Sequence, residues 1–448
     1  MNRQQIGPRV FAWLRSTILL RHFRNAGVLL MGKGTGAIFS LVYLGLAVRT
    51  LGPEAFGVLV LLHTLVHTAG ELAKFQSWQA IMRYGALALA GSRVADLQRL
   101  VKFTLLLDLA GAAAGIGIAL LCIGPALRFL NIPAEAEPLA MAYSAVIFFM
   151  SPAMPNGFLR LFDRFDLIAA QNVVGPAIRL LGALALWAAG AGLPAFLALW
   201  FLSTAASAIT LMVLALRELH RQGMLRDMPL TLRGLAAPHK FIWSFVWSTN
   251  LNTTLNLASD RVGTLAVGWL LGPDAAGLYR IAHHVTDAIR KPASKLLTPT
   301  IYPELARLSA TGESAAAHNI VARSAILAGA ATAGAFGLVV LFGQPLLHYA
   351  FGPEFVAAYE VMVLMALAGV IATVAFPLEP LLVSAGRMRA VITARTTATV
   401  LYILLLYLTL QQFGIVGAGI AAIAYTGATA GLLLAFSGRI QGAGISST

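Results

Sequence analysis

The chain has 448 residues, of which 58% are hydrophobic and only 11% are charged, and its mean hydropathy is +0.79. No soluble domain has this composition, so the sequence predicts a membrane protein. The formal net charge of +14 would by itself fit a nucleic-acid-binding protein, but the placement of the charges, described below, excludes that class. The single cysteine, Cys122, excludes an internal disulfide and a metal site built from paired thiols.

Apolar stretches of about 20 residues, long enough to cross roughly 30 Å of hydrocarbon, occur in both halves of the chain. We predict twelve spans, at roughly 26–49, 55–80, 101–126, 138–159, 168–190, 194–216, 241–270, 275–300, 319–343, 355–383, 391–412 and 416–438. Six fall in each half. The sequence therefore predicts an all-α polytopic membrane protein with an N-terminal lobe over residues 1–225, which includes an Arg-rich amphipathic start, and a C-terminal lobe over residues 226–448.

The basic residues lie mainly on one side of the predicted membrane. Of the 32 Lys and Arg residues, only Arg49 and Arg128 fall in loops on the other side, where the turn at 134–137 is acidic. The positive-inside rule then places both termini in the cytoplasm, so the basicity reflects topology and we expect no nucleic acid as partner. We expect a multi-pass protein of the bacterial cytoplasmic (inner) membrane. The longest loop, about 217–240, is too short for a fused ATPase or an external catalytic module.

The second half of the chain repeats landmarks of the first half at an offset of 220 residues. The run Leu51–Gly57 returns as Leu271–Gly277, and Pro133 corresponds to Pro353. With an even number of spans in each half, both halves enter the membrane from the same side, so the repeat is expected to be parallel. Paired halves of this kind are a recurring plan of secondary transporters, with the substrate site between them.

Ten charged residues fall at membrane depth. The bases are Lys33, Lys74, Arg179, Arg261 and Arg280, and the acids are Glu71, Asp108, Asp260, Asp287 and Glu379. Charges inside a membrane are costly and usually face a bundle interior or a water-filled cavity, so each is a candidate functional residue. The alternative is that they form salt bridges between helices or reach an interface, and the sequence leaves both interpretations open.

Polar residues form matching stripes on the second and eighth spans. On the second span His63, His67, Glu71 and Lys74 follow one helical face, and on the eighth Arg280, His283, His284, Asp287, Arg290 and Lys291 do the same. Because a polar stripe does not comfortably face lipid, we expect both helices to line a cavity between the lobes. Hydrogen bonding between helices in a dry core is the alternative.

The seventh span carries further polar residues. Ser248, Asn252, Asn256 and Asp260 recur at steps of four, with Arg261 beside them. Its counterpart, the first span, is rich in glycine, so that Lys33 alone would face the cavity. Prolines occur at corresponding places in the fourth and tenth spans, at Pro152, Pro155, Pro377 and Pro380. They predict bends that serve either as hinges or as static kinks.

The run Asn256–Arg261 followed by Gly268–Ala282 resembles the second-half signature of polysaccharide-transporter, Wzx-type lipid-linked oligosaccharide flippases. The runs Leu51–Gly57 and Tyr302–Leu305 are similar to the same family, which belongs to the multidrug/oligosaccharidyl-lipid/polysaccharide exporter superfamily. The resemblance covers essentially the whole chain through its span count, loop lengths and repeat. Its motifs are short and apolar, so they indicate the superfamily well and the substrate poorly.

The resemblance implies a transporter and not an enzyme, one that moves an undecaprenyl-diphosphate-linked oligosaccharide to the outer leaflet by alternating access for O-antigen, capsule or exopolysaccharide synthesis. The expected partners are this lipid-linked glycan, membrane lipid and the polysaccharide polymerase machinery, with the protein itself a monomer. No cofactor or metal is expected, and a proton or sodium gradient is the candidate energy source.

A cationic cavity would lower the barrier to moving a diphosphate through a low-dielectric interior. The candidates for contacting the diphosphate are Arg280, Arg261, Lys33, Lys74 and Arg179, and those for sugar hydroxyls are Asn252, Asn256, His63 and His283. The carboxylates of Asp260, Asp287 and Glu71 either hold neighbouring bases or bind a coupling ion.

Three alternatives stay open at this point. An ion-coupled multidrug antiporter of the same superfamily would offer carboxylates to organic cations, and the five bases against five acids at membrane depth favour an anion only modestly. An integral-membrane enzyme would need a long external loop or an acid/base cluster near one interface, and the sequence contains neither. A non-transporting scaffold of envelope assembly would have no reason to keep charges in both polar stripes.

Overall fold

The computed structural model describes residues 17–150, 153–226, 228, 231, 234–235, 241–310 and 313–445. Within these ranges the side chains of 17–26, 28–33, 248–260 and 289–300, and of a few positions at 302–315 and beyond 438, are not described. The regular structure of the described residues is helical throughout, with no strand among them.

The first half of the chain forms the following helices. They are α2 (Thr17–Ala73), α3 (Ser77–Ala80), η2 (Ile81–Gly85), α4 (Ala86–Ala90), α5 (Val94–Phe129), η3 (Ala134–Ala136), α6 (Glu137–Ser144), η4 (Ala145–Phe149), α7 (Ala153–Leu161), α8 (Phe165–Ala188) and α9 (Leu193–Arg221). The second half forms α10 (Ile242–Ala310), α11 (Ser314–Leu346), η5 (Leu347–Phe351), η6 (Pro353–Ala358), α12 (Tyr359–Ala375), α13 (Leu378–Ser384), α14 (Met388–Phe413) and α15 (Val416–Ile445).

The two longest helices are each divided by a glycine. In α2, Gly52 has φ 72° and ψ 174°, and in α10, Gly272 has φ 87° and ψ 176°. Residues with a β-carbon do not adopt this conformation readily, so the glycines mark the ends of one membrane span and the start of the next. The equal backbone angles at two positions of the predicted repeat show that the duplication extends to local structure.

The predicted fold class is confirmed. Among the described residues, nine helical segments are long and apolar enough to cross a membrane, and one of them, Gly34–Ala90, contains the bend at Gly52. With that segment counted as two spans and α10 contributing one span on each side of Gly272, the chain has twelve spans, six in each half.

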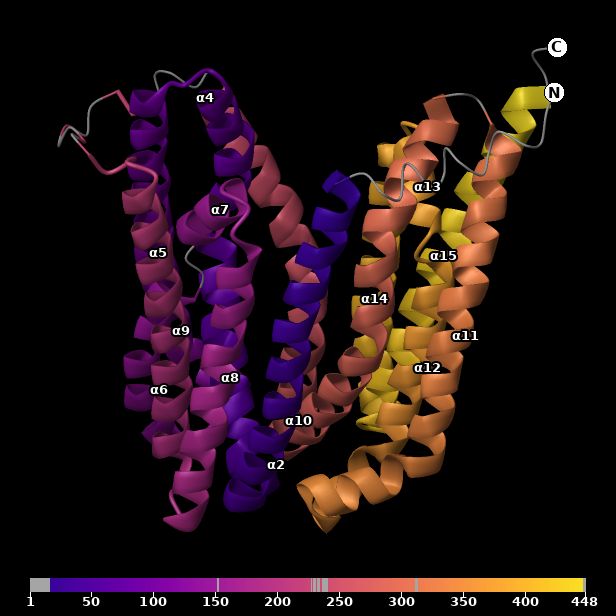
Figure 1. Ribbon diagram of the computed structural model, residues 1–448. Coiled ribbons are helices and arrows are strands. Elements are labelled where there is room, and N and C mark those ends of the chain that lie inside the picture. The colour runs from indigo at the N-terminus through magenta and orange to yellow at the C-terminus, as the bar shows by residue number, and fades with distance from the viewer. Residues whose placement is uncertain are drawn as a thin grey trace. The chain divides into compact units, whose positions relative to one another are not determined.

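Contacts divide the chain into two compact units. The first comprises Met1–Thr50, Leu65–Leu127 and Pro133–Ala258, and the second comprises Leu51–Thr64, Arg128–Ile132 and Ser259–Thr448. Within each unit the long helices lie side by side, with α8 against α9 in the first and α14 against α15 in the second (Figure 1). The lobe boundary predicted at residue 225 stays a prediction, as does a cavity between the lobes.

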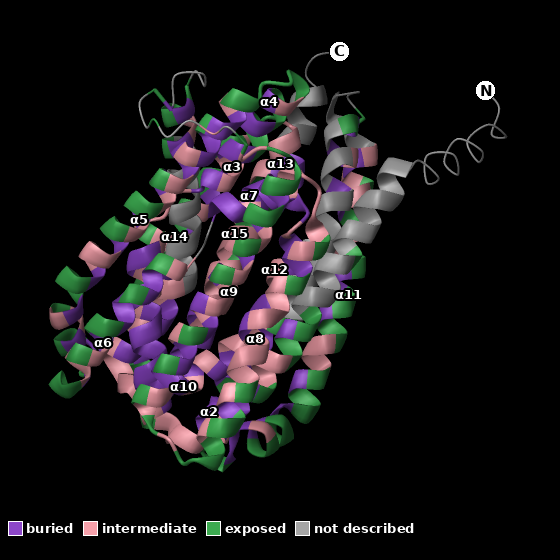
Figure 2. Cartoon of the chain, turned by 60° about the vertical axis from the view of Figure 1, so that its left-hand side comes forward, coloured by how far each residue is buried: buried purple, intermediate pink, exposed green. Residues whose placement is uncertain are grey.

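Apolar residues are exposed along the outer helices, as expected for faces that contact lipid. On α5, Leu121 is 80% exposed, and on α11, Ile326 and Leu341 are 71% and 70% exposed. Figure 2 shows exposed residues along the length of both helices. In water such faces would be destabilising, but in a bilayer their surroundings are as apolar as the side chains themselves.

The repeat is also visible where the fourth and tenth spans end. Asp163 and Gly386 both have positive φ, 60° and 76°. The next residues, Arg164 and Arg387, have similar non-helical angles and precede α8 and α14. The Arg164 backbone N–H donates to the carbonyl of Leu159 at 2.8 Å, and that of Arg387 donates to Leu382 at 2.9 Å. The offset between equivalent residues in this part of the chain is therefore 223.

Candidate functional site

The first unit contains a partly open cavity of about 520 Å³, lined by both polar and apolar residues. Its walls come from the end of α2 and the segment after it, from η4 and α7, and from facing stretches of α8 and α9. The lining residues are His67, Lys74, Gln76, Trp78, Phe149, Met150, Ala153, Asn156, Arg160, Gln171, Gly175, Pro176, Arg179, Ser203, Thr204, Ser207, Ala208 and Leu211. All of them belong to the first unit.

Interrupted helices form two of these walls. Helix α2 ends at Ala73, residues 74–76 are not helical, and the short helix α3 begins at Ser77. The stripe predicted along one continuous second span is therefore wrong at its end, because Lys74 lies beyond the helix. The backbone leaves the helical conformation at Gln76, with φ −86° and ψ 53°, which turns this segment along the cavity. On the opposite wall, α7 begins at Ala153 with Pro155 in its first turn.

Arg160 is held on one face of the cavity by two neighbours. Its Nε donates a hydrogen bond to Asn156 Oδ1 at 2.5 Å, and its guanidinium lies 5.2 Å from the centre of the Trp78 ring. The indole is itself fixed, because its Nε1 donates to Gln76 Oε1 at 2.9 Å. This arrangement orients the guanidinium but leaves its terminal nitrogens, among the described residues, without a hydrogen-bond acceptor.

Arg179 is held more completely. Its Nε donates to Ser203 Oγ at 2.7 Å, Nη1 to Tyr43 Oη at 3.3 Å and Nη2 to Thr204 Oγ1 at 3.3 Å. The guanidinium also lies 5.7 Å from the centre of the Tyr43 ring and 5.4 Å from that of Trp200. All three nitrogens therefore have a neutral partner, and the charge is stabilised by two aromatic faces.

The cavity has an excess of positive charge. Among the described residues that line it, none is an aspartate or glutamate. Lys74 Nζ lies 3.5 Å from Glu71 Oε1, whereas in the described part of the chain neither Arg160 nor Arg179 forms an ion pair. Burying a charge in a membrane protein without a counter-charge is unfavourable by several kcal/mol. An anion that binds in the cavity would supply the missing counter-charge and so lower this unfavourable energy.

A half-buried carboxylate lies behind the residues that line the cavity. Asp108 on α5 accepts a hydrogen bond from Ser77 Oγ at 2.6 Å and another from the backbone N–H of Met154 at 2.8 Å. Both of its oxygens are thus occupied by donors at the starts of α3 and α7. Asp108 does not itself line the cavity.

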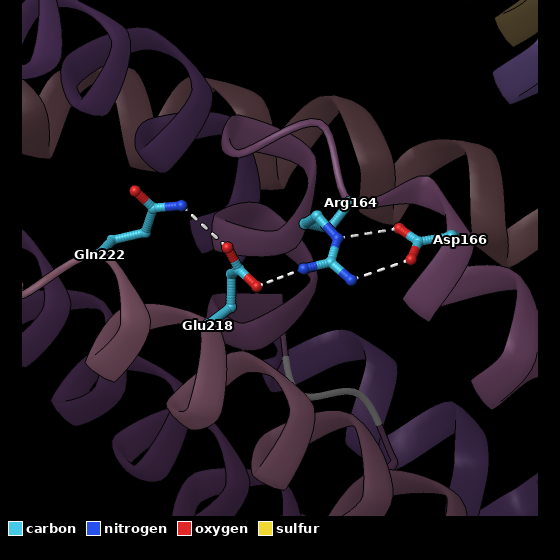
Figure 3. Close-up of polar contacts among 4 residues, drawn as sticks. All are labelled: Arg164, Asp166, Glu218 and Gln222. Atoms are coloured by element: carbon cyan, nitrogen blue, oxygen red, sulfur yellow. Dashed lines mark hydrogen bonds and ion pairs between the residues drawn. The ribbon is translucent and has the colours of Figure 1, made fainter.

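The far end of α7 is held by the turn that follows it. Arg164 Nη1 pairs with Glu218 Oε2 on α9 at 2.5 Å, and Nη2 pairs with Asp166 Oδ2 at 2.9 Å. Gln222 Nε2 donates to the other Glu218 oxygen at 2.9 Å (Figure 3). The hydrogen bond with Asp166 raises the pKa of Arg164 above its ordinary value.

Comparison with known proteins identifies the family. A family described as polysaccharide biosynthesis protein matches residues 22–309. The inner membrane protein YghQ of Escherichia coli (strain K12) is 33% identical to the chain over 359 residues, which is 80% of this chain and 99% of that protein. The chain belongs to the polysaccharide biosynthesis protein family.

Solved structures share the fold of this family member at low sequence identity. An inward-facing multidrug resistance MATE family transporter of the MOP superfamily has a TM-score of 0.74 and 15% identity, covering 94% of this chain and all of that one. The lipid II flippase MurJ in an inward closed conformation has a TM-score of 0.68 and 11% identity, covering 92% of this chain and 87% of that one. A MOP superfamily transporter from Pyrococcus furiosus, described as having a binding pocket of reverse polarity, has a TM-score of 0.62 and 14% identity, covering 96% of each chain. The predicted resemblance to a polysaccharide transporter family is confirmed by the family match, and Wzx-type specificity stays a prediction.

The structure divides the predicted site residues between the two units. Lys74, Arg179 and Glu71 lie in the first unit, and Lys74 and Arg179 line its cavity. In the second unit His63 is buried, Arg261 and Arg280 are half-buried, and His283 Nδ1 lies 3.3 Å from Asp287 Oδ2. The side chains of Lys33, Asn252, Asn256 and Asp260 lie outside the described residues. The roles assigned to all of these residues stay predictions.

Sequence reasoning missed Arg160, which it placed in a cytoplasmic loop. The structure corrects this: Arg160 lies within α7 and lines the cavity. Its step of four from Asn156, immediately after Pro155, was a usable signal, because that spacing puts the two side chains on one helical face. Trp78, Gln171 and Ser203 were missed as well, since neutral polar and aromatic residues in apolar spans carry no charge signal.

The cavity suits recognition more than catalysis or metal binding. Among the described residues no three His, Cys, Asp or Glu side chains gather closely enough to hold a metal ion. What the walls offer instead is guanidinium and ammonium charge, amide and hydroxyl hydrogen-bonding groups, and an indole ring. These are the groups that bind phosphoryl oxygens and sugar hydroxyls.

Proposed function

We propose that this protein is a flippase that moves a polyprenyl-diphosphate-linked oligosaccharide from the cytoplasmic to the outer leaflet, for the synthesis of a cell-surface polysaccharide. Membership of the polysaccharide biosynthesis family supports the pathway. The observation that carries the substrate class is the cavity of the first unit, which has two arginines without a counter-charge and no carboxylate in its lining.

The diphosphate is the part of such a substrate that crosses the membrane least readily without protein contacts. Its charge is costly in a low-dielectric interior, and a guanidinium can bind phosphoryl oxygens through two parallel hydrogen bonds. Arg160 suits this task, because Asn156 and Trp78 fix its orientation while its terminal nitrogens are available. Lys74 adds a second, more flexible cation on the facing segment.

Neutral polar groups in the same cavity suit the first sugars of the glycan. Gln76, Asn156 and Gln171 supply amides, and Ser203, Thr204 and Ser207 supply hydroxyls. Sugars are bound by such groups together with aromatic faces. The cavity thus combines anion and hydroxyl recognition, as a diphosphate joined directly to a sugar requires.

The expected setting follows from the family and the topology. We place the protein in the inner membrane with both termini in the cytoplasm, in agreement with the charge distribution and with the description of the related YghQ as an inner membrane protein. Transport would proceed by alternating access and draw on a proton or sodium gradient. The lipid-linked glycan, membrane lipid and polymerase machinery remain the proposed partners of a monomer that is not an enzyme.

An ion-coupled multidrug antiporter is the second candidate, since a multidrug resistance transporter shares the fold. An organic cation would need a carboxylate within reach, and the lining of this cavity contains none. A related transporter from Pyrococcus furiosus is itself described as having a pocket of reverse polarity that suggests a different function. A scaffold without transport is disfavoured because half-buried arginines without a counter-charge bring no benefit to a protein that binds nothing in their cavity.

The test is a leaflet-translocation assay in proteoliposomes with a fluorescent polyprenyl-diphosphate oligosaccharide. Wild type is compared with Arg160→Gln, which removes the charge but keeps polarity. The matched control is Arg99→Gln on α5, an exposed arginine of the same unit outside the cavity lining. We expect wild type and the control to flip the lipid equally and Arg160→Gln to flip it at least about 30-fold more slowly.

The same vesicles separate the other candidates. A neutral polyprenol-linked glycan should be a poor substrate, because it lacks the anion. If wild type instead exchanges a cationic dye for protons and ignores the diphosphate lipid, the protein is an antiporter. If correctly inserted wild type moves neither compound, the transport assignment is wrong and the scaffold assignment stands.

A further inference from the structure

Of the two cations that suit the diphosphate, one lies in a helix break and the other lies in a short helix. Lys74 lies in the segment 74–76 between α2 and α3, and Arg160 lies in the short helix α7, which starts at Ala153. A helix break has few backbone hydrogen bonds of its own to fix its geometry. Something else must therefore hold these two segments in register.

We infer that Asp108 is a positioning residue, which joins the starts of α3 and α7 so that Lys74 and Arg160 are presented together to one anionic group; this inference rests on the proposed function. One oxygen of Asp108 accepts from Ser77 Oγ at 2.6 Å. The other accepts from the Met154 backbone N–H at 2.8 Å. A single carboxylate on α5 thus connects two segments that are far apart in the sequence.

The contacts between α3 and α7 show what this connection holds together. Trp78 follows Ser77 directly, and its ring packs against the Arg160 guanidinium. Gln76 precedes Ser77 and fixes the indole nitrogen. If the start of α3 shifted relative to α7, the indole and the guanidinium would separate. Arg160 would then lose the face that orients it.

The far end of α7 is held independently. Arg164, in the turn after α7, is fixed between Asp166 and Glu218, as Figure 3 shows. Asp108 holds the first turn of the helix and Arg164 holds the last. With both ends fixed, the side chains of Asn156 and Arg160 between them keep one position relative to the cavity, and preorganised donors bind an anion more tightly than mobile ones.

The second unit has no carboxylate at the position equivalent to Asp108. In the repeat, α5 and α11 correspond at an offset of 220, with Pro125 matching Pro345. The residue equivalent to Asp108 is then Ala328, which is buried. Equivalent helices therefore pack without a buried acid, so Asp108 is not required by the fold. An acid at this position only in the unit that contains the cationic cavity agrees with a role for Asp108 in that cavity.

The experiment is a double-mutant cycle on the full-length protein in detergent. Binding of inorganic pyrophosphate and of a short-chain polyprenyl diphosphate is measured by calorimetry for wild type, Asp108→Asn, Arg160→Gln and the double variant. Asn in place of Asp108 removes the charge. It can hold both segments only with its amide oxygen accepting from the Met154 N–H and its amide nitrogen donating to Ser77 Oγ, which reverses the hydrogen bond to Ser77. The control is Asp96→Asn, an acid on the same helix that pairs with Arg93 and Arg99 outside the cavity.

The sign of the effect separates positioning from simple charge. Removing a negative charge close to a cationic site should strengthen anion binding, whereas losing the geometry should weaken it. We expect Asp108→Asn to weaken binding by about tenfold in the wild-type background and by less than roughly twofold when Arg160 is already replaced. Asp96→Asn should leave the affinity unchanged.

Three results would overturn the inference. It is wrong if Asp108→Asn strengthens binding, if it has no effect, or if it weakens binding equally in both backgrounds, which would mean that Asp108 does not act through Arg160. Ser77→Ala, which removes one donor and no charge, takes its place in the cycle if Asp108→Asn fails to fold. Failure of wild type to bind either diphosphate would instead overturn the proposed function.

Discussion

The two units have equivalent backbones but different chemistry at equivalent positions. The glycine bends, the positive-φ turns and the helix starts recur at offsets of 220 to 223 residues. At three positions in and behind the cavity of the first unit, however, the second unit has apolar or aromatic residues. The equivalents of Asp108, Arg160 and Arg179 are Ala328, Val383 and Tyr402. The cavity is therefore a property of one unit and not of the fold.

The contacts of Tyr402 support this correspondence. In the first unit Arg179 meets the ring of Tyr43. The equivalent of Tyr43 is Gly263, where an added β-carbon would lie 2.8 Å from the hydroxyl oxygen of Tyr402. In the first unit the tyrosine is on α2 and faces an arginine on α8. In the second unit a glycine on α10 leaves room for a tyrosine on α14. The second unit fills the space that the first unit leaves for a guanidinium.

Charge compensation differs in the same way. In the second unit Arg395 pairs with Glu379 at 2.6 Å, and His283 Nδ1 lies 3.3 Å from Asp287 Oδ2. Glu379 occupies the position equivalent to Asn156, the neutral partner of Arg160. Where the second unit supplies a carboxylate, the first supplies an amide. The first unit thus leaves positive charge that only a ligand neutralises.

The largest effect should follow from placing the first unit's residue in the second. Tyr402→Arg would bury a guanidinium at a site that is 7% exposed. We expect destabilisation by several kcal/mol and poor recovery of folded protein. Thermal unfolding in detergent and the yield of monodisperse protein measure it.

The reciprocal substitution, Arg179→Tyr, sharpens the comparison. Ser203 and Thr204 also donate to the carbonyl of Trp200, at 2.9 Å and 2.8 Å, so their hydroxyls keep a partner when the arginine is lost. We therefore expect a smaller destabilisation, about 1–3 kcal/mol. Equal losses from the two substitutions would contradict the claim that only the first unit is built for a cation.

The next largest effect concerns the turns that follow α7 and α13. Glu218 is 4% exposed and accepts from both Arg164 and Gln222, so Glu218→Ala should destabilise the first unit by about 2–3 kcal/mol. The equivalent arginine of the second unit, Arg387, donates only to the carbonyl of Phe436 at 2.8 Å. Arg387→Ala should cost about 1 kcal/mol. Chemical unfolding in mixed micelles gives both values, and a larger loss for Arg387→Ala would reverse the expected ranking.

The fold was predictable because the membrane restricts what a span can look like. Backbone groups in lipid must be satisfied within a helix, so each span appears as a long apolar run. The bends at Gly52 and Gly272 were readable as a repeated motif, although their backbone angles were not. The sequence did not reveal that α2 ends at Ala73, because residues 74–76 are compatible with a continuing helix. The contact that accompanies the new helix start is the hydrogen bond from Ser77 to Asp108, which joins residues distant in the sequence.

The site was predictable only where a charge interrupts an apolar run. Lys74 and Arg179 were found in this way. Arg160 was not, because it lies close to Asp163 and Arg164 and so resembles part of a charged loop. Its position in the cavity depends on packing against Trp78, a contact between distant segments. A single sequence contains no sign of such a contact, and neutral groups such as Gln171 give even less.

The glycine bends are a feature at which the two halves should behave alike. Gly52→Ala and Gly272→Ala each place a β-carbon on a residue with positive φ and ψ near 180°, a region almost restricted to glycine. Each should destabilise the protein by about 1–3 kcal/mol, and by nearly the same amount. The thermal midpoints of the two purified variants provide the measurement. Markedly different values would mean that the two bends, although equal in their angles, are supported differently by their surroundings.

The smallest effect on stability should come from replacing a neutral residue that lines the cavity. Gln171 donates to both the carbonyl and the hydroxyl of Ser207, and its equivalent in the second unit is the fully buried Ala394. Gln171→Ala should lower stability by no more than about 1 kcal/mol, because Ser207 gains access to water in the cavity.

The same variant separates the two halves of the proposed substrate. If amides such as Gln171 contact sugars and arginines contact phosphate, Gln171→Ala should weaken binding of a diphosphate that carries a glycan and leave the affinity for inorganic pyrophosphate unchanged. Calorimetry with the two ligands measures the difference. An equal loss for both would place Gln171 with the anion-binding groups, and the division of the cavity into an anionic and a neutral region would then be wrong.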